Sequence, residues 1–256
     1  MTEQATATDR FRAILVLAAT AATIIFNWLA AIGRVGGVTP AEISAMYPTL
    51  ITPAGYAFSI WSLIYLGLVA FSIYQLTPLA LSRFRGIRSL YILSYALNCA
   101  WIYMWHHNRI AICMIIITGL LGTLFVINLR LRSLAGNRDF WLAKAPFSIY
   151  FGWVTAATLV NFAILLVYLD IQITPATNTA IAVGLILIAG ILAVAVRKFM
   201  GNYLYPLAVG WAVAAIGVKQ SGQTAIVLTT AIVLIVCLVA ALSFVVNLPS
   251  SSDSTS

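Results

Sequence analysis

Several apolar stretches of the sequence carry aromatic, amide and hydroxyl side chains at helical intervals. In chain order these are Asn27 and Trp28; Phe58, Trp61, Tyr65 and Ser72; Tyr91, Tyr95, Asn98, Trp101 and Trp105; and Tyr150, Trp153, Ala157 and Asn161. Spacings of three, four and seven residues put the members of each of the last three sets on one helix face. An asparagine facing lipid would cost free energy, so we expect these faces to point into a helix bundle. Indole and phenol rings around small alanines offer stacking surfaces and a few hydrogen-bond donors, which suit a large, flat, mostly apolar ligand.

The same side chains also have a simpler interpretation as interface and packing residues. Trp and Tyr are enriched at both membrane interfaces, and Tyr56 and Trp105 lie near the ends of their apolar stretches. An interior asparagine can join two helices, with a contribution of only ~1 kcal/mol.

No motif in the sequence indicates catalysis or a metal. There is no Gly-rich phosphate loop, no HExxH and no nucleophile elbow. His106 and His107 could suggest a metal or haem ligand. Adjacent helical residues point about 100° apart, however, so an interfacial loop explains the pair better. Cys99, Cys113 and Cys237 have no metal or redox spacing and are interpreted as packing residues. We therefore predict no catalytic residue, no metal site and no required cofactor.

The composition predicts an all-α, polytopic membrane helical bundle. The 256 residues are 62% hydrophobic and 8% charged, too few charges to cover a soluble domain of this size. About 20 apolar helical residues cross the ~30 Å hydrocarbon core. We expect eight spans, at 11–32, 55–75, 89–106, 110–129, 146–169, 176–196, 204–218 and 224–246. The seventh is short for a full crossing.

Capping signals predict where several helices begin. Thr52-Pro53 and Thr174-Pro175 each place a capping hydroxyl before a proline at the first helical position. The stretch TPAE, which begins at Thr39, is a capping box and predicts a short helix that ends before Pro48. That helix lies in the longest loop, which is either a cover for a binding site or an ordinary interfacial segment.

The cations predict the orientation in the membrane. Eleven of the fourteen Lys and Arg residues fall in one set of alternating connections, and the other set holds Arg34, Arg109 and Lys219. By the positive-inside rule, both termini are expected in the cytoplasm. The net charge of +8 forms no contiguous basic face, so we expect a lipid bilayer and not a nucleic acid as partner. The expected location is a bacterial inner or plasma membrane.

The chain divides by composition. Six of the seven Trp residues precede residue 154, whereas the last three spans consist mainly of Ile, Val, Leu and Ala. The seventh span, with AVGWAVAAIG, is rich in small residues that suit close helix packing. We predict a five-helix unit over residues 1–170, a three-helix unit over 171–247 and a disordered cytoplasmic tail over 248–256.

Three segments, in the expected order, resemble the translocator protein family, also called tryptophan-rich sensory proteins (TspO type). TPAGYAFSIWSLIYLGLVAF, from Thr52, is similar to that family's second-helix signature. ALNCAWIYMW, from Ala96, matches its Leu-Asn-x-x-Trp pattern, and WVTAATLVN, from Trp153, matches the fifth-helix pattern. One residue fewer separates Tyr56 from Trp61 than in the common pattern. The resemblance covers about residues 11–170, so the chain is identified as an extended relative with additional C-terminal helices.

The resemblance implies a cavity between helices at the outer end of the bundle, covered by the first loop, that binds porphyrins such as protoporphyrin IX or haem. Carried over to this sequence, Trp61, Asn98, Trp101, Trp153, Ala157 and Asn161 would form the cavity wall. Many members of the family are dimers, so a homodimer is possible. Animal members carry a sterol-recognition pattern that needs Lys or Arg soon after a Tyr; here LDIQIT follows Tyr168, so cholesterol binding is not supported.

The leading hypothesis is an integral membrane binding protein, carrier or sensor for flat hydrophobic ligands such as tetrapyrroles, with a bound porphyrin or haem as the possible cofactor. The candidate binding residues are Asn27, Trp61, Tyr65, Asn98, Trp101, Trp153, Ala157 and Asn161. One alternative is a small-solute transporter, which would not be coupled to ions through intramembrane charges because no span has Asp, Glu, Lys or Arg near its middle. Others are a porphyrin-degrading, enzyme-like activity and a purely structural module.

Overall fold

The computed structural model describes residues 5–243, and that part of the chain consists of helices joined by turns and loops. Its long helices are α1 (Ala7–Ala31), α3 (Ile60–Tyr74), α5 (Arg88–His106), α6 (Ile110–Leu131), α8 (Ala145–Tyr168), α9 (Pro175–Met200), α10 (Leu204–Lys219) and α11 (Thr224–Leu242). The short elements are α2 (Pro40–Met46), η1 (Gly55–Ser59), α4 (Pro78–Leu81), α7 (Asn137–Asp139) and η2 (Phe140–Lys144). The predicted all-α bundle is confirmed. The predicted tail at 248–256 lies outside the described residues.

The helices are those of a multi-pass membrane protein. Six helical segments of the described chain are long and apolar enough to cross a bilayer by length and composition. α5, with 19 residues, is not among them. α10 has only 16 residues, and such a helix rises roughly 24 Å, short of the ~30 Å hydrocarbon core. The total of eight spans therefore stays a prediction.

Two of the three predicted helix starts are confirmed. Before α2, the Thr39 backbone N–H donates to the Glu42 carboxylate (2.7 Å) and the Glu42 N–H donates to the Thr39 hydroxyl (3.3 Å). α2 then ends at Met46, as expected. Before α9, the Thr174 hydroxyl accepts the Thr177 N–H (3.2 Å).

The predicted helix start at Thr52-Pro53 is wrong. Ala54 is extended, η1 begins at Gly55 and α3 only at Ile60. The Thr52 hydroxyl instead bonds to the Thr49 hydroxyl (2.9 Å), which closes a turn. The Ala54 N–H donates to the Ala215 carbonyl of α10 (3.0 Å), so a tertiary contact holds the segment out of a helix.

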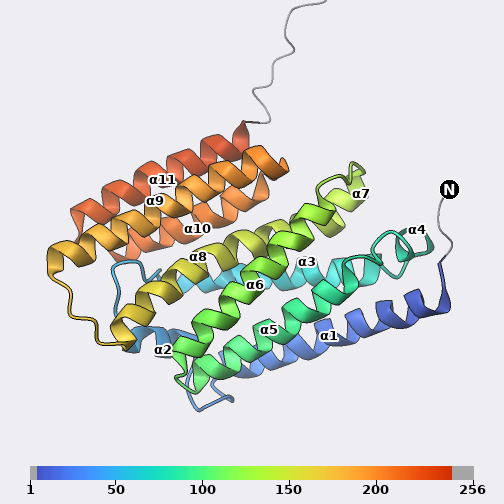
Figure 1. Ribbon diagram of the computed structural model, residues 1–256, viewed down its shortest axis with the longest axis horizontal. Coiled ribbons are helices and arrows are strands. Elements are labelled where there is room, and N and C mark those ends of the chain that lie inside the picture. Colours follow the sequence, from blue (N-terminus) through green and yellow to red (C-terminus); the bar gives the residue numbers. More distant parts are fainter. Residues whose placement is uncertain (1–4, 244–256) are drawn as a thin grey trace, which may run out of the picture.

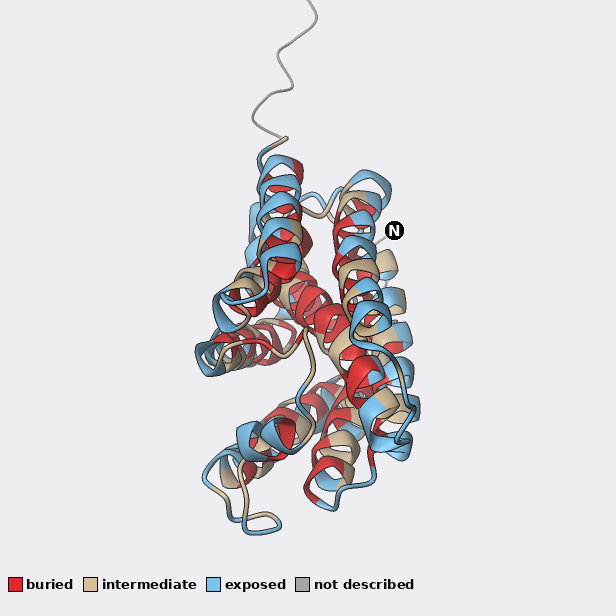
Figure 2. Cartoon of the chain, turned by 90° about the vertical axis from the view of Figure 1, so that its left-hand side faces the viewer, coloured by how far each residue is buried: buried red, intermediate tan, exposed pale blue. Residues whose placement is uncertain are grey.

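α8 lies at the centre of the bundle, where it packs against α3, α6, α9 and α10. In the helical segment that contains α8, 61% of the most apolar 18-residue stretch is buried, against 33–39% in the other candidate spans. Figure 2 shows the buried residues on the helix sides that face one another. A Cβ at Gly67 would lie 2.9 Å from the Pro146 ring, and one at Gly152 would lie 2.7 Å from the Tyr205 carbonyl oxygen. α3 and α10 thus approach α8 closely through these glycines.

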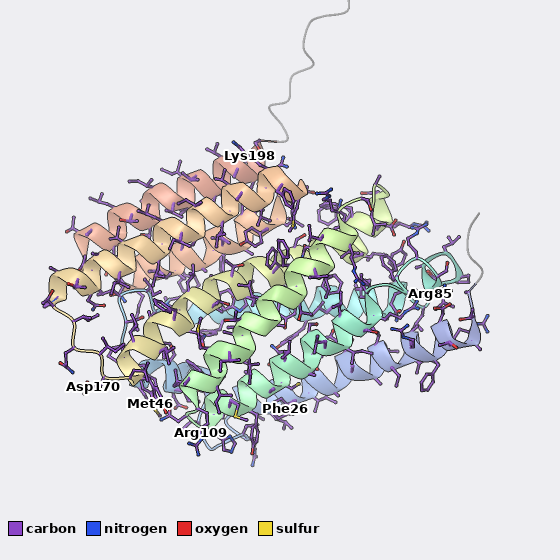
Figure 3. All side chains as sticks on the ribbon, viewed as in Figure 1. Phe26, Met46, Arg85, Arg109, Asp170 and Lys198 are labelled. Atoms are coloured by element: carbon purple, nitrogen blue, oxygen red, sulfur yellow. The ribbon has the colours of Figure 1, made fainter. Side chains whose placement is uncertain are left out.

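The long helices run back and forth between two ends of the bundle (Figure 1). The end where α1 begins, and where α4 and α7 lie, is called the basic end, because the connections there carry the larger set of cations. The opposite end, near α2, is called the pocket end. Arg85 lies at the basic end, and Arg109 and Asp170 lie at the pocket end (Figure 3). The uneven cation distribution is therefore present in the fold, whereas the side of the membrane that each end faces stays a prediction.

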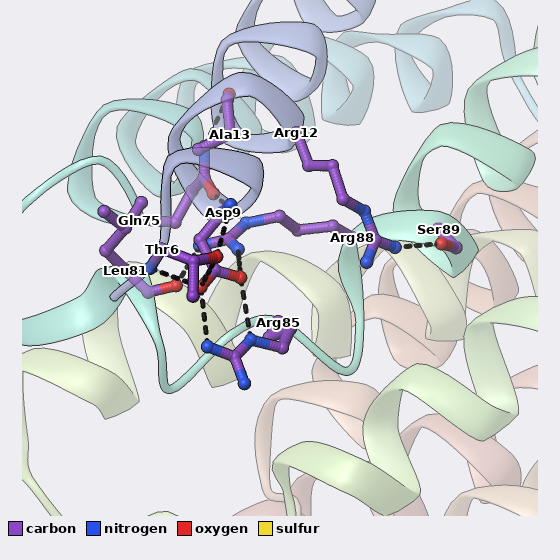
Figure 4. A network of polar contacts seen from close by, with 9 residues as sticks. All are labelled: Thr6, Asp9, Arg12, Ala13, Gln75, Leu81, Arg85, Arg88 and Ser89. Carbon is purple, nitrogen blue, oxygen red and sulfur yellow. Dashed lines mark hydrogen bonds and ion pairs between the residues drawn. The ribbon is translucent and has the colours of Figure 1, made fainter. Parts of the chain in front are cut away.

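A buried ion-pair network closes the basic end (Figure 4). Asp9 is 2% exposed and Arg88 is fully buried. Asp9 accepts hydrogen bonds from Arg85 Nε (2.7 Å) and Nη2 (2.6 Å) and from Arg88 Nη1 (3.3 Å). Arg88 Nε also donates to the Gln75 side-chain oxygen (2.8 Å). The network links the start of α1 to α5 and to the turn that follows α3.

Polar contacts also connect α10 and the turn before it to the first five long helices. The Tyr205 hydroxyl donates to the Thr155 hydroxyl of α8 (2.9 Å). The Asn202 amide donates to the Ser148 hydroxyl (2.5 Å) and to the Asn128 carbonyl oxygen of α6 (3.2 Å). Residues on both sides of the predicted boundary at 170 therefore pack directly on one another, and the division into two units stays a prediction.

Candidate functional site

The aromatic faces of α3, α5 and α8 converge on one hollow at the pocket end, called the aromatic pocket. Its wall includes Phe58, Trp61, Trp101, Trp105 and Trp153. About 740 Å³ of the hollow is free of atoms, a figure that includes its open mouth. Small-molecule sites are lined mainly by apolar and aromatic side chains, as this hollow is.

η1 and the first turn of α3 supply one side of the pocket. The Phe58 ring meets the Trp153 ring edge-on, with centroids 5.9 Å apart. The Trp61 ring also meets Trp153 edge-on, at 6.3 Å. Tyr65, one helical turn after Trp61, stacks on it at 5.3 Å and does not line the pocket. Tyr65 therefore supports the wall from behind.

α5 supplies the second side. Trp101 and Trp105 lie one helical turn apart, and their rings are stacked with centroids 5.2 Å apart and 22° between their planes. Asn98 lines the pocket and is only 1% exposed, because Asn27 of α1 covers its other side and donates to its side-chain oxygen (2.8 Å). Asn27 itself does not line the pocket. Trp28, its neighbour, is 59% exposed and does not line it either.

α8 supplies the third side through Trp153, Ala157 and Asn161. The Asn161 oxygen accepts the indole N–H of Trp101 (3.2 Å), which joins α8 to α5 across the pocket wall. The Asn161 amide nitrogen donates to the Ala157 carbonyl of its own helix (2.9 Å). Tyr150, from the same predicted face, lies behind the wall and packs edge-on against Trp61 at 5.7 Å.

α2 covers the pocket, so the loop predicted as a possible cover lies over it. Pro40 and Ser44 line the hollow, and the Trp105 indole N–H donates to the Pro40 carbonyl (3.2 Å). The Tyr47 hydroxyl donates to the Asn108 side-chain oxygen after α5 (2.6 Å). Hydrogen bonds from Thr39 hold the pKa of Glu42, in the first turn of α2, below the usual glutamate value.

The pocket also has walls that sequence reasoning missed. Ile117 and Leu120 of α6 line it, as do Ala212 and Ile216 of α10. These aliphatic residues look like any other in an apolar helix. The small residues of the seventh predicted span were the one available signal, since they indicated a close helix contact. The Trp211 indole N–H fixes that contact by donating to the Ala57 carbonyl (3.0 Å).

Two indole N–H groups of the pocket have no hydrogen-bond acceptor in the described part of the chain. Those of Trp101, Trp105 and Trp211 are satisfied, as described above, but none of the described residues accepts from Trp61 or Trp153. Both rings line the hollow. Their N–H groups are not fully buried, since His106 Nε2 is the one buried side-chain nitrogen or oxygen without a partner in the described residues. An occupant with hydrogen-bond acceptors near these two rings would satisfy them. No ionisable side chain lines the pocket among the described residues, so its wall offers stacking and hydrogen bonding and no acid or base.

His106 is the last residue of α5, so the predicted interfacial loop is wrong for it, whereas His107 is the C-cap and lies in the turn that follows. His106 Nδ1 lies 2.8 Å from the Ile102 carbonyl, and its buried Nε2 has no partner in the described residues. His107 is exposed, with Nδ1 2.8 Å from the Tyr103 carbonyl. Neither lines the aromatic pocket. Over residues 5–243, no three His, Cys, Asp or Glu side chains are grouped to hold a metal ion.

Comparison with known proteins gives one family. The family model described as TSPO-like protein matches residues 13–244, which is most of the chain and includes α9, α10 and α11. No curated protein and no solved structure matches the chain.

Proposed function

The chain belongs to the TSPO-like protein family, and on that premise we propose that it binds flat, mostly apolar ligands of the tetrapyrrole class as a carrier or sensor. The observation that carries the proposal is the convergence of four indole rings and two asparagines from separate helices on one hollow. These are Trp61, Trp101, Trp105 and Trp153, with Asn98 and Asn161. Aromatic faces stack on a planar ring system, and the carboxamides and free indole N–H groups orient its polar edge.

The packing below the pocket supports binding rather than passage through the bundle. Between the pocket and the basic end, the hydroxyls of Thr20, Ser72 and Tyr91 are mutually hydrogen-bonded, at 2.6 Å for Thr20–Ser72 and 2.8 Å for Ser72–Tyr91. Tyr95 donates to Tyr91 in the same cluster. All four residues are buried. A ligand would therefore enter and leave at the pocket end.

The cation distribution indicates on which side of the membrane the ligand would enter. Because the basic end carries most of the Lys and Arg residues, the positive-inside rule favours a cytoplasmic location for it and for both termini. The aromatic pocket would then open toward the opposite face of the membrane. Labelling of single cysteines introduced at Lys198 and at Asp170 in whole cells, with a membrane-impermeant maleimide, tests this orientation. Reaction at position 198 and not at 170 would contradict it.

Titration of the purified protein with protoporphyrin IX, followed by tryptophan quenching, tests the ligand class. Trp153→Ala removes a ring of the pocket, and we expect the Kd to rise roughly tenfold, which corresponds to a stacking contribution of about 1.4 kcal/mol. Trp28→Ala is the matched control, because it removes one exposed indole outside the pocket and should leave the Kd unchanged.

The outcomes separate the site from general membrane partitioning. If Trp153→Ala and Trp28→Ala change the Kd equally, the ligand does not occupy the aromatic pocket. If protoporphyrin IX binds no better to the protein in lipid nanodiscs than to empty nanodiscs, the tetrapyrrole proposal fails.

A further inference from the structure

A second hollow, called the vestibule, adjoins the aromatic pocket. Both hollows are lined by Ser44, Pro53 and Phe58, so they meet at these residues. The vestibule holds about 1,010 Å³ of atom-free space, including its open side. It lies between α2, the segment that leads to η1 and the end of α10, on the outer side of the residues that it shares with the aromatic pocket.

The two hollows differ in polarity. The aromatic pocket is lined by rings and aliphatic side chains, with Asn98, Asn161 and Ser44 as its few polar groups. The vestibule adds a second kind of lining, which consists of Thr49, Thr52, Asn178, Lys219 and Gln220. A molecule that filled both would be apolar along its body and polar at its outer end.

Lys219 gives the vestibule its charge. It is the last residue of α10, it is exposed, and within the described chain its ammonium group makes no hydrogen bond or ion pair. None of the described residues that line the vestibule is acidic. Asp170 lines the neighbouring hollow between α8 and α9, where its carboxylate accepts a hydrogen bond from Gln172 (2.7 Å). The cation at the mouth is thus available to an anion from outside the chain.

The walls on either side of Lys219 are fixed. The Gln220 side chain donates to the Thr49 carbonyl (3.0 Å), which ties the end of α10 to the segment before η1. The Ala54 N–H donates to the Ala215 carbonyl one turn earlier in α10 (3.0 Å). These two bonds hold the backbone of Lys219 beside the opening, while its flexible side chain can follow a ligand.

We propose that the aromatic pocket and the vestibule form one site for an amphipathic anion. The flat apolar body lies between the indole rings, and an ionised acid group lies in the vestibule beside the Lys219 ammonium group. This rests on the proposed function and narrows it, because a flat ligand without an acid group would leave the cation of the vestibule unused. It also gives α10 a direct part in ligand selection.

Two porphyrins that share one ring system provide the test. Protoporphyrin IX carries two carboxylic acids, and its dimethyl ester carries none. Both are titrated into the full-length protein in nanodiscs of uncharged phosphatidylcholine at low salt, with empty nanodiscs as background. An exposed ion pair contributes little, so Lys219→Gln is expected to weaken binding of the acid by about threefold to fivefold and to leave the ester unchanged. Lys219→Glu should weaken the acid further, because it adds repulsion. High salt should remove the acid's advantage in the wild-type protein.

Arg109→Gln is the matched control. Arg109 is another exposed cation at the pocket end, but it does not line the vestibule. An equal effect of Arg109→Gln and Lys219→Gln would assign the effect to general surface charge and overturn the proposal. The proposal would also be overturned if the wild-type protein bound the acid no more tightly than the ester and Lys219→Gln changed neither affinity. That result would still be consistent with a pocket for flat ligands. Failure of both porphyrins to bind the wild-type protein would overturn the proposed function and this inference together.

Discussion

The two ends of the bundle use polar side chains in opposite ways. At the basic end, Asp9 and Arg88 are almost completely buried, and the hydrogen bonds of Asp9 are filled by Arg85, Arg88 and Thr6. At the pocket end, Trp61 and Trp153 line a hollow, and their indole N–H groups have no acceptor among the described residues. Polar groups that satisfy one another stabilise a fold, and polar groups left without partners are available to a ligand. The basic end therefore stabilises the fold, and the pocket end is the part of the molecule that we propose for binding.

The largest expected effect is at the basic end. Asp9→Asn removes the carboxylate that pairs with both Arg85 and Arg88 and leaves the buried Arg88 guanidinium without this counter-ion. We expect a loss of about 3–5 kcal/mol in the free energy of unfolding, measured by SDS-induced unfolding in detergent micelles. Arg83→Gln is the control, because the Arg83 side chain in the Arg83–Asp139 pair is 44% exposed, and such a pair contributes roughly 0–1 kcal/mol. Equal losses from both variants would show that the buried network has no special part in stability.

The next largest effect is expected at the contact between α8 and α10, where a substitution should change both stability and ligand binding. A Cβ at Gly152 would lie 2.7 Å from the Tyr205 carbonyl oxygen and 2.8 Å from the Ala208 Cβ. Gly152→Ala should therefore push α10 from α8 and cost about 1–3 kcal/mol of stability. Because Ala212 and Ile216 of α10 line the pocket, porphyrin binding by the folded protein should weaken as well.

Gly184 in α9 provides the control for that substitution. An added Cβ there would meet nothing within 4 Å, and exchanging Gly for Ala in a helix is favourable by roughly 1 kcal/mol. Gly184→Ala should therefore keep or raise stability and leave porphyrin binding unchanged. Weaker binding in Gly184→Ala would mean that α10 is not the route by which Gly152→Ala acts.

The same substitution at two asparagines should separate stability from binding. Asn128 lies toward the basic end, where it donates to the Phe147 carbonyl (3.1 Å) and accepts from Asn202 (3.2 Å). Asn128→Ala should cost about 1–2 kcal/mol of stability and leave porphyrin binding unchanged. Asn98 lines the pocket, and Asn98→Ala should in addition raise the Kd for protoporphyrin IX roughly fivefold, through the loss of about 1 kcal/mol. If Asn128→Ala weakens binding as much as Asn98→Ala does, the division between the two ends fails.

A smaller effect is expected where α2 covers the pocket. Trp105→Phe keeps the stacking on Trp101 but removes the hydrogen bond to the Pro40 carbonyl, a loss of about 1 kcal/mol. α2 should then open more often, and amide hydrogen exchange in residues 40–46 should become faster while that of α8 stays unchanged. Unchanged exchange in α2 would show that this bond does not hold the cover in place.

Helical periodicity predicted which rings and amides of α3, α5 and α8 share a face, because a helix has 3.6 residues per turn. It did not predict Val154, Ala156 and Val160 of α8, which also line the hollow. Periodicity does not fix depth. Tyr65 and Tyr150 share faces with wall residues but lie behind Trp61. Asn27 likewise reaches the pocket only through Asn98. Which residue of a face lines the hollow depends on how closely the neighbouring helix packs. The distance between the two helices cannot be read from a single sequence.

Contacts distant in sequence account for what could not be predicted. Ala212 and Ile216 line the pocket because Gly152 lets α10 approach α8, a contact across more than fifty residues of chain. The capping signal at Thr52-Pro53 failed because the Ala54 N–H is bonded to α10. The capping box at Thr39 succeeded because all its partners lie within four residues. Local signals are reliable where local groups satisfy one another.

That capping box gives the smallest predicted effect, a loosening of α2 in acid. The Thr39 hydrogen bonds lower the pKa of Glu42 in the folded protein. The carboxylate thus stabilises α2 fully above the unfolded glutamate pKa of about 4.3, and this contribution is lost as pH falls through the lower folded value. Between pH 6 and 8, the contribution of Glu42 to the stability of α2 should not change with pH. Glu42→Gln can keep the reciprocal hydrogen bonds without the charge, so the ratio of its amide exchange rate to that of the wild type, in residues 40–46, should be constant from pH 6 to 8 and fall toward pH 3. A ratio that stays constant down to pH 3 would mean that the charge of Glu42 does not help to hold the cover over the pocket.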